Sequence, residues 1–147
     1  MIKTFFAGLM IITSIKSFAQ YKKVYPYNEY QTNWAMVKTM SGTYGFIDKN
    51  NKQVVAPVYS KIDKFGKLHK DLALVKSISD TYGMIDIQGK LVVQAIYKRI
   101  GKFDELKKGY ALVESINNYY GLINENGKEA IPANYSMEEL KSRLNDL

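Results

Sequence analysis

Few side chains in this sequence can do chemistry, and the most suggestive are two aspartates in equivalent segments. Asp48 and Asp86 lie 38 residues apart, in TYGFID and TYGMID. Two carboxylates held close together can carry the acid and nucleophile roles of a glycosidase. The third such segment, YYGLIN, has Asn124 at this place. Because Asp and Asn both accept backbone hydrogen bonds at the start of turns, we interpret these residues as turn residues and keep a small carboxylate-dependent hydrolase as the less favoured alternative.

Other catalytic and metal-binding chemistries lack the residues that they need. His69 is the only histidine, cysteine is absent, and His69 aligns with Lys107 in the next copy, so we expect a solvated loop histidine. Zinc sites need several His or Cys ligands, and an activated nucleophile needs a base beside it. The segment SGTYG, at 41–45, fits neither a phosphate loop nor a nucleophile elbow. The sequence therefore predicts a non-enzymatic protein with no catalytic residue, cofactor or metal.

Tyrosine is the remaining candidate for ligand contact, because the sequence contains 12 of them. Tyr25 and Tyr119 align with polar residues in the other copies, which favours exposure. Exposed tyrosines near lysines can stack on sugars or contact a protein partner, so these two are the candidate binding aromatics. The tyrosines expected to pack in the core are Tyr21, Tyr27, Tyr30, Tyr44, Tyr59, Tyr82, Tyr97, Tyr110, Tyr120 and Tyr135.

A repeat of about 38 residues places all of these side chains. Shifted by that length, the sequence aligns with itself without a gap, and its three Tyr-Gly pairs coincide. Self-similarity at a fixed period is typical of architectures in which neighbouring units bury a continuous core. The predicted divisions are a half unit at 21–33, units at 34–71, 72–109 and 110–135, and a C-terminal helix at 136–147.

Each unit is predicted to be a three-stranded antiparallel meander, so the fold class is all-β. In the first unit, β-prone segments near 34–39, 43–48 and 52–56 are separated by turn residues. Gly42 and Asn51 stand where hairpin turns need positive φ, which Gly and Asn adopt most readily. The sequence does not decide between an open solenoid and a closed, barrel-like arrangement of the units.

Two further patterns predict local packing. Glycine inside a strand marks a close approach by another group, and we expect an aromatic ring or backbone of a neighbouring unit on Gly45, Gly83 and Gly121. After the third strand, Ile62 and Phe65 stand three residues apart, as do Ile100 and Phe103. That spacing predicts one turn of helix or a compact loop that lays two anchors on the sheet.

The C-terminal residues read as an amphipathic helix. Ser136 and Glu139 form a capping box. Met137, Leu140, Leu144 and Leu147 follow on one helical face. Because repeat arrays need atypical terminal units to cover the exposed end of the core, we interpret this helix as a cap, with a partner-binding helix as the alternative.

The first 19 residues have the layout of a secretory signal peptide. Lys3 precedes a short apolar run at 5–15, and Ser17 and Ala19 supply small residues before a cut between Ala19 and Gln20. The run is shorter than the roughly 20 residues that span a bilayer. We therefore expect a periplasmic or secreted domain at 20–147, without stable membrane insertion. Its excess of scattered lysines favours solubility, and export argues against a nucleic-acid partner.

The repeated pattern is similar to that of the WG-repeat family. The likeness rests on an apolar strand such as LALVK, then YGFID, a turn with Gly-Lys, a tyrosine, and finally Ile and Phe, and it covers nearly all of 21–135. Tyrosine replaces the consensus tryptophan in every copy, Asn51 replaces a turn glycine and Asn124 a turn aspartate, which makes this a divergent member. The family is mostly bacterial. The resemblance implies a β-rich repeat domain used for binding, with no catalytic residues. We expect a non-enzymatic interaction module whose partner is a protein or an envelope glycan, with glycan or cell-wall binding as the alternative function.

Overall fold

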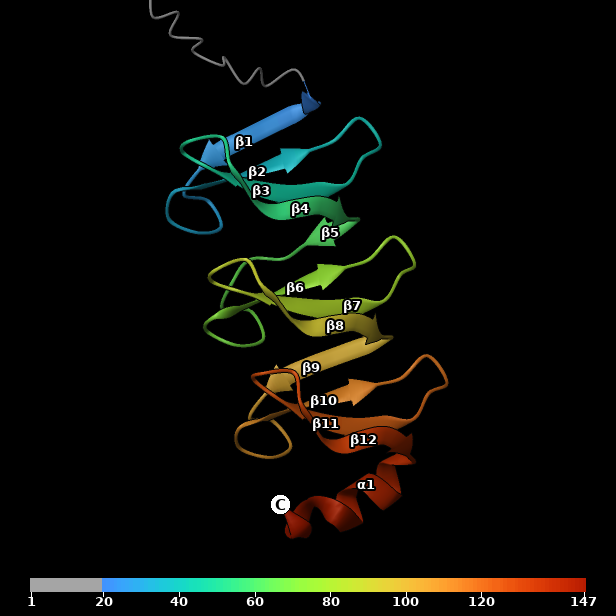
Figure 1. The fold of residues 1–147 in the computed structure, drawn as a ribbon. Helices are drawn as coiled ribbons and strands as arrows, with labels where there is room; N and C mark the ends of the chain where they lie inside the picture. Colours follow the sequence, from blue (N-terminus) through green and yellow to red (C-terminus); the bar gives the residue numbers. More distant parts are fainter. Residues whose placement is uncertain (1–19) are drawn as a thin grey trace, which may run out of the picture.

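The computed structural model describes residues 20–147, which form three four-stranded antiparallel sheets stacked in a row and a short C-terminal helix (Figure 1). The strands are β1 (Lys23–Tyr27), β2 (Trp34–Lys38), β3 (Tyr44–Asp48), β4 (Gln53–Tyr59), β5 (Lys61–Ile62), β6 (Leu72–Lys76), β7 (Tyr82–Asp86), β8 (Leu91–Tyr97), β9 (Arg99–Phe103), β10 (Tyr110–Glu114), β11 (Tyr120–Asn124) and β12 (Glu129–Tyr135). The helix α1 (Met137–Arg143) and the 3-10 turn η2 (Leu144–Asp146) follow. The signal peptide predicted for 1–19 lies outside the described residues.

The predicted three-stranded meander is present in each sheet, as β2-β3-β4, β6-β7-β8 and β10-β11-β12. Its second turn depends on the aspartate discussed above: Asp48 Oδ1 accepts the N–H groups of Asn50 and Lys52 at 2.8 and 2.9 Å. Asp86 and Asn124 accept the equivalent bonds in their own units. Gly42 and Asn51, which were predicted to need positive φ, both have it. Their equivalents in the later units, Asp80, Gly89, Asn118 and Gly127, have it too.

Each sheet also has a fourth strand, β1, β5 or β9, where the residue spacing suggests a helical turn or a loop. That expectation is wrong for Ile100 and Phe103, which both lie on β9 and are both buried. Ile100 is opposite Val113 and Phe103 is opposite Ala111, so β9 holds one residue more than its partner strand between the two pairs. Such a β-bulge returns the chain to the same face after three residues instead of two.

The last strand of one sheet continues directly into the edge strand of the next. Only Ser60 separates β4 from β5, and its N–H donates to the carbonyl oxygen of Lys76 at 2.8 Å. Lys98 makes the same connection between β8 and β9, and its N–H donates to the carbonyl oxygen of Glu114. Because one extended segment serves two sheets, the units follow one another as an open stack (Figure 1).

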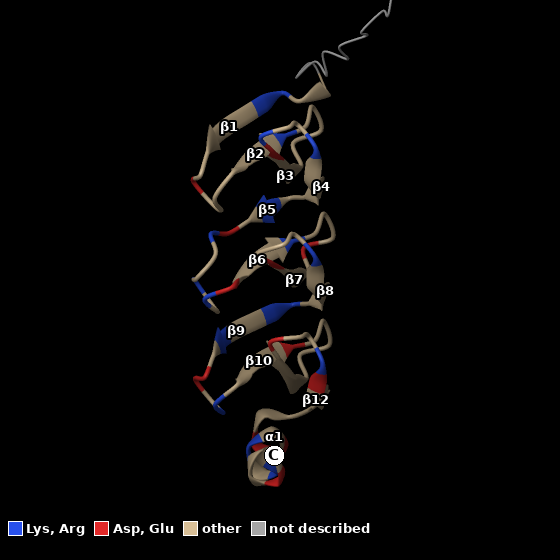
Figure 2. Ribbon diagram, turned by 60° about the vertical axis from the view of Figure 1, so that its left-hand side comes forward, with Lys and Arg blue, Asp and Glu red and all other residues tan. Residues whose placement is uncertain are grey.

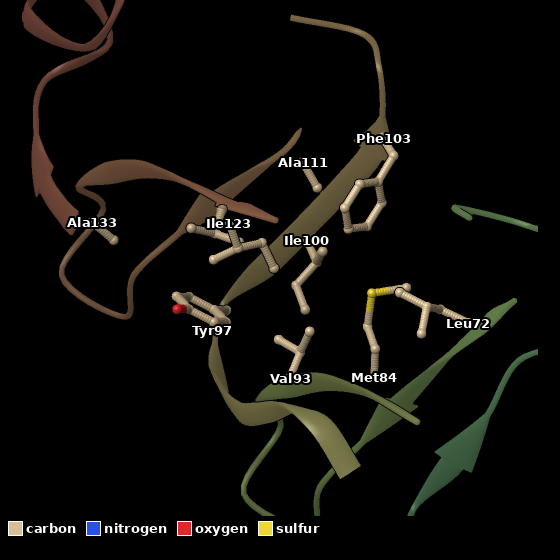
Figure 3. Packing of buried hydrophobic residues seen from close by; sticks show 10 residues of the cluster. Leu72, Met84, Val93, Tyr97, Ile100, Phe103, Ala111, Ile123 and Ala133 are labelled. Carbon is tan, nitrogen blue, oxygen red and sulfur yellow. The ribbon is translucent and has the colours of Figure 1, made fainter. Parts of the chain in front are cut away.

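Neighbouring sheets are held together by a shared apolar layer, since the chain has no cysteine to form disulfides. Between the second and third sheets, Met84 and Val93 of one sheet face Ile100 of the next, with Ile123 behind it (Figure 3). Met84, Val93 and Ile123 are fully buried. Full burial of one such side chain contributes roughly 1.5–3 kcal/mol. The stability of each unit therefore depends on the unit beside it.

The glycines of the Tyr-Gly pairs have the close contact that was predicted, but with a different partner. A Cβ atom at Gly83 would collide with the carbonyl oxygen of Val93 and lie 2.8 Å from the backbone nitrogen of Ala95. Both belong to β8 of the same unit, so the expected contact with a neighbouring unit is wrong. The register of β7 and β8 shifts on both sides of Met84, which brings the β8 backbone over the glycine.

The close contact between units is made instead by the turn glycines. A Cβ atom at Gly89 would lie 2.9 Å from the carbonyl oxygen of Val54, which belongs to β4 of the preceding unit. Gly127 lies in the same way against the Val92 carbonyl group of β8.

The C-terminal helix covers the last sheet. Leu140 is fully buried against Leu122 and Ile131. The capping box is present, with the Ser136 N–H donating to Glu139 Oε2 at 2.8 Å. The predicted cap is thus confirmed, although Leu147 lies beyond the helix and is exposed. Within 20–147 no helix combines the length and apolar character needed to cross a bilayer.

Candidate functional site

The residues with the most obvious chemistry have structural roles. Asp48 and Asp86 direct carboxylate oxygens to turn N–H groups of their own units, as the turn interpretation predicted. His69 is not a solvated loop residue: its side chain is 14% exposed, and its ring lies 5.0 Å from the ring of Phe103. Its Nε2 lies 3.3 Å from Glu125 Oε2 in the third unit. Among the described residues, no group of three or more His, Cys, Asp or Glu could hold a metal ion.

The residue at the position of His69 links each sheet to the next sheet or, in the last sheet, to the C-terminal 3-10 turn. Its equivalent in the half unit, Gln31, donates from Nε2 to the carbonyl oxygen of Ile87 at 3.5 Å. Its equivalent in the third sheet, Lys107 between β9 and β10, donates from Nζ to the carbonyl oxygen of Leu144 at 2.9 Å. Because Gln, His and Lys at this position all contact the sheet or helix that follows, the position serves packing between successive parts of the stack.

Two grooves lie at equivalent places between successive sheets. The first groove, of about 780 Å³, has Tyr25 and Tyr44 of the first sheet on one side and Lys61 and Asp63 of the second sheet on the other. The second groove, of about 360 Å³, lies between the second and third sheets. Three of its lining residues, Tyr82, Arg99 and Glu114, stand 38 positions after Tyr44, Lys61 and Lys76 of the first groove.

The edge strands carry basic residues along the side of the stack where these grooves lie. Lys and Arg mark β1, β5 and β9, which follow one another down the stack (Figure 2). Strand pairing then places a charged residue of the next strand directly opposite: Lys23 faces Lys38 in the first sheet. The equivalent pairs are Lys61 with Lys76 in the second sheet and Arg99 with Glu114 in the third.

The charges of this cross-strand pair are compensated differently in each of the three sheets. In the third sheet, Glu114 is 8% exposed and its carboxylate lies 3.0 Å from Lys98 Nζ and 3.4 Å from Arg99 Nε. The second groove therefore neutralises its own charge. Opposite charges facing each other across strands are stabilising, whereas like charges are destabilising.

In the second sheet the two lysines face each other, but each has an acidic partner. Lys61 Nζ lies 3.1 Å from Asp63, which Lys67 also contacts at 3.0 Å, and Lys76 Nζ lies 2.7 Å from Asp80. Burial alone would raise the pKa of Asp63, but the hydrogen bonds from Lys67 and Lys61 outweigh it and hold that pKa below its usual range. Asp63 is therefore ionised at neutral pH.

In the first sheet the lysine pair has no acidic partner within ion-pair distance among residues 20–147. Each ammonium group lies over a tyrosine ring instead, Lys23 at 4.3 Å from the centroid of Tyr25 and Lys38 at 5.2 Å from that of Tyr44. Lys64 lies in the same way over Tyr30, at 5.8 Å. The ring quadrupole offsets part of the repulsion between the lysines, but it supplies no countercharge.

The tyrosines of the first groove form a packed wall. The rings of Tyr25 and Tyr44 lie 6.5 Å apart, and Tyr30 lies 5.5 Å from the buried Phe46. The Lys38 ammonium group, close enough to bond to the Tyr44 phenol, lowers the pKa of Tyr44, and Tyr44 in turn raises the pKa of Lys38. Lys38 is therefore fully charged at neutral pH, and the wall presents ammonium and hydroxyl groups together.

The two candidate aromatics are not brought together. Tyr25 lies on β1 and lines the first groove, half-buried against Tyr44. Tyr119 is 49% exposed beside β11 of the third sheet and lines neither groove. A ligand role for Tyr119 stays a prediction.

Most of the first groove is not evident from the individual residues of the sequence. From the sequence, Tyr44 and Tyr30 are expected to be core residues. Lys23, Lys38 and Lys64 are expected to be surface lysines scattered along the chain. One signal was available: the residue equivalent to Lys38 is Lys76 in the next unit and Glu114 in the last. A repeat position at which the sign of the charge changes is under a different constraint in each copy.

Three stacked antiparallel sheets, generated by a sequence repeat and sharing their cores, define a β-repeat protein. The sequence model of the WG containing repeat matches residues 44–77, 82–120 and 120–137, which together are more than half of the chain. The chain therefore belongs to the WG containing repeat family, as the resemblance implied. Comparison with curated proteins and with solved structures finds no match.

Proposed function

We propose that this protein is an exported, non-enzymatic binding module that takes its ligand in the first groove. The observation that carries the proposal is the facing pair Lys23 and Lys38. These two cations have no acidic partner among the described residues, and they lie at the rim of the first groove, over Tyr25 and Tyr44, which line it. Uncompensated like charges on neighbouring strands cost stability. A ligand that supplies the missing negative charge would recover that cost on binding.

The rest of the molecule supports a binding role for this place in particular. The first groove is about twice the volume of the second. In the second groove, the Glu114 carboxylate neutralises the basic residues. Ligand sites are usually concave, with a largely apolar wall and a few polar groups that fix orientation. The first groove combines a wall of three tyrosines with lysines at its margin.

A non-enzymatic assignment is supported by how the carboxylates are used. Asp48 and Asp86 hold turns, and the two acids of the first groove, Asp63 and Asp80, are held by lysines. A glycosidase needs one carboxyl group that stays protonated and one that is free to attack or to activate water. The partner that we expect is a protein or an envelope glycan, in the periplasm or outside the cell.

Site-specific photo-crosslinking tests this proposal. A photoreactive residue replaces Lys64 at the first groove, which leaves Lys23 and Lys38 in place, and a matched variant carries it at Lys49, an exposed turn residue of the same unit. Both proteins are irradiated in cell-envelope extract. We expect a discrete adduct at position 64 and none at position 49. Adducts at both positions, or at neither, contradict a ligand site in the first groove.

A further inference from the structure

We propose that the ligand of the first groove is an acidic polysaccharide, a chain of uronate-type sugars whose carboxylates contact Lys23 and Lys38. This inference rests on the proposed function and names the class of its ligand. It draws on three observations: the charge of the groove, the way in which its aromatic rings are covered, and the adjacency of the two grooves.

The charge of the first groove calls for an anionic ligand. Six lysines lie in it or over its tyrosines, namely Lys23, Lys38, Lys61, Lys64, Lys67 and Lys76. The two aspartates that line it, Asp63 and Asp80, are both already engaged by lysines. The groove therefore keeps a positive excess after its internal ion pairs are formed, and a cleft with one sign of charge concentrates ligands of the other sign.

The rings are arranged for a ligand rich in hydroxyl and carboxylate groups, not for stacked bases. An ammonium group lies over each of Tyr25, Tyr30 and Tyr44. Single-stranded nucleic acids bind by stacking their bases on free aromatic faces, and these faces are already partly covered. The cations are all lysines, which act as point charges for single carboxylates, whereas phosphate recognition more often uses the planar fork of arginine.

The two grooves are adjacent, which favours a polymer over a small acid. Lys61 and Asp63 line both grooves. A chain that occupies the first groove can therefore pass over β5 towards Lys98 and Arg99 of the second. Because those two residues are engaged by Glu114, the second groove adds contact area and little net charge. The affinity should rise with the length of the chain.

Titration calorimetry with the full-chain protein tests the ligand class. The probes are polygalacturonate, a neutral glucan of similar length, poly-L-glutamate and oligodeoxythymidylate. We expect polygalacturonate to bind at least about tenfold more tightly than each of the others, to weaken as salt rises, and to bind more tightly than its own di- or trisaccharide. Equal or tighter binding of the neutral glucan, of poly-L-glutamate or of the oligonucleotide overturns the inference.

Two variants with the same change in net charge locate the site. The first combines Lys23→Gln, Lys38→Gln and Lys64→Gln. The control combines Lys49→Gln, Lys108→Gln and Lys141→Gln, at three exposed lysines outside the first groove. We expect the groove variant to lose at least about tenfold in affinity for polygalacturonate, and the control to stay within about threefold, because general charge attraction is screened. Equal losses overturn the inference.

A gain-of-affinity variant keeps the inference testable if the groove variant folds poorly. Asp63→Asn removes a negative charge from the groove and releases Lys61 and Lys67. We expect it to bind polygalacturonate about threefold more tightly or better; unchanged or weaker binding overturns the inference. If the crosslinker at position 64 gives adducts but polygalacturonate does not bind, the proposed function stands and the acidic-polysaccharide inference fails.

Discussion

Lys23 and Lys38 face each other across neighbouring strands of the first sheet, and each ammonium group lies over a tyrosine ring. In the third sheet the same pair is Arg99 and Glu114, joined at 3.4 Å. One fold position thus holds either a repulsive or an attractive pair. Both like-charge pairs lie at the larger groove: Lys61 and Lys76 line it, and Lys23 and Lys38 lie over its tyrosines. This is expected if charge that could stabilise the fold is kept available for a ligand.

Replacing the like-charge pair of the first sheet with the opposite-charge pair found in the third sheet should separate the effect on stability from the effect on binding. Lys38→Glu places a carboxylate opposite Lys23, so we expect the free energy of unfolding to rise by about 0.2–1 kcal/mol while affinity for polygalacturonate falls at least about tenfold. Urea denaturation and calorimetry measure the two effects. Lys49→Glu makes the same charge change on an exposed turn and should do neither. A variant that binds as well as the parent would show that Lys38 is not a ligand contact.

The turn glycines offer a test of how successive units fit together. Gly89→Ala combines positive φ with contact against Val54, whereas Gly109→Ala has the same φ of 85° and no atom within 4 Å. We expect Gly109→Ala to cost about 1–2 kcal/mol from the backbone alone, and Gly89→Ala about 1–3 kcal/mol more from overpacking. Urea midpoints give the difference. Equal losses would mean that the turn does not set the distance between units.

The repeat and its turns could be predicted from sequence because their causes are local. A positive-φ residue and a turn-capping Asp or Asn affect only the backbone within about five residues. Asp48 and Gly89 can therefore be recognised as turn residues from the local sequence. The fourth strand could not be found in this way. A bulge in β9 gives Ile100 and Phe103 a spacing of three, which is the spacing of a helical turn, and only the pairing with β10 shows that it is a strand.

The C-terminal helix should behave as a cap whose loss exposes the last sheet. Leu140→Ala removes a fully buried side chain from the contact with Leu122 and Ile131, and we expect a loss of about 2–5 kcal/mol. Leu147→Ala, at an exposed residue beyond the helix, should change stability by less than about 0.5 kcal/mol. Thermal denaturation compares them. If Leu140→Ala were as mild as Leu147→Ala, the helix would not be a cap.

Acid should weaken the junction between the two grooves through Asp63. Its folded-state pKa lies below the unfolded value of 3.8, so the unfolded chain binds the proton more readily. The stability that Asp63 adds is therefore present above about pH 4 and is lost as the pH falls through the folded-state pKa. We expect the parent to be more stable than Asp63→Asn at pH 6 and the difference to shrink steadily as the pH falls below about 4. A difference that did not shrink with falling pH would contradict this role.

The groove itself could not be predicted because its parts come from different units. Tyr44 recurs as Tyr82 and Tyr120 and therefore looks like a core residue, and Lys23 is one of 21 basic residues in the sequence. Their relation appears only when strand pairing sets Lys23 beside Lys38 and the stacking of sheets brings β5 to the groove lined by Tyr44. The family match identifies the repeat units and not the contacts between them.

The most direct test of a ligand site in the first groove is a chemical-shift titration of the isotope-labelled protein with polygalacturonate oligomers. We predict that amide shifts concentrate in β1, at the end of β2 and in β5, around Lys23, Lys38 and Lys64, and that they saturate together. Shifts centred instead on the turns at Asp48 and Asp86 or on Tyr119, or no saturable shift at all, would contradict the account.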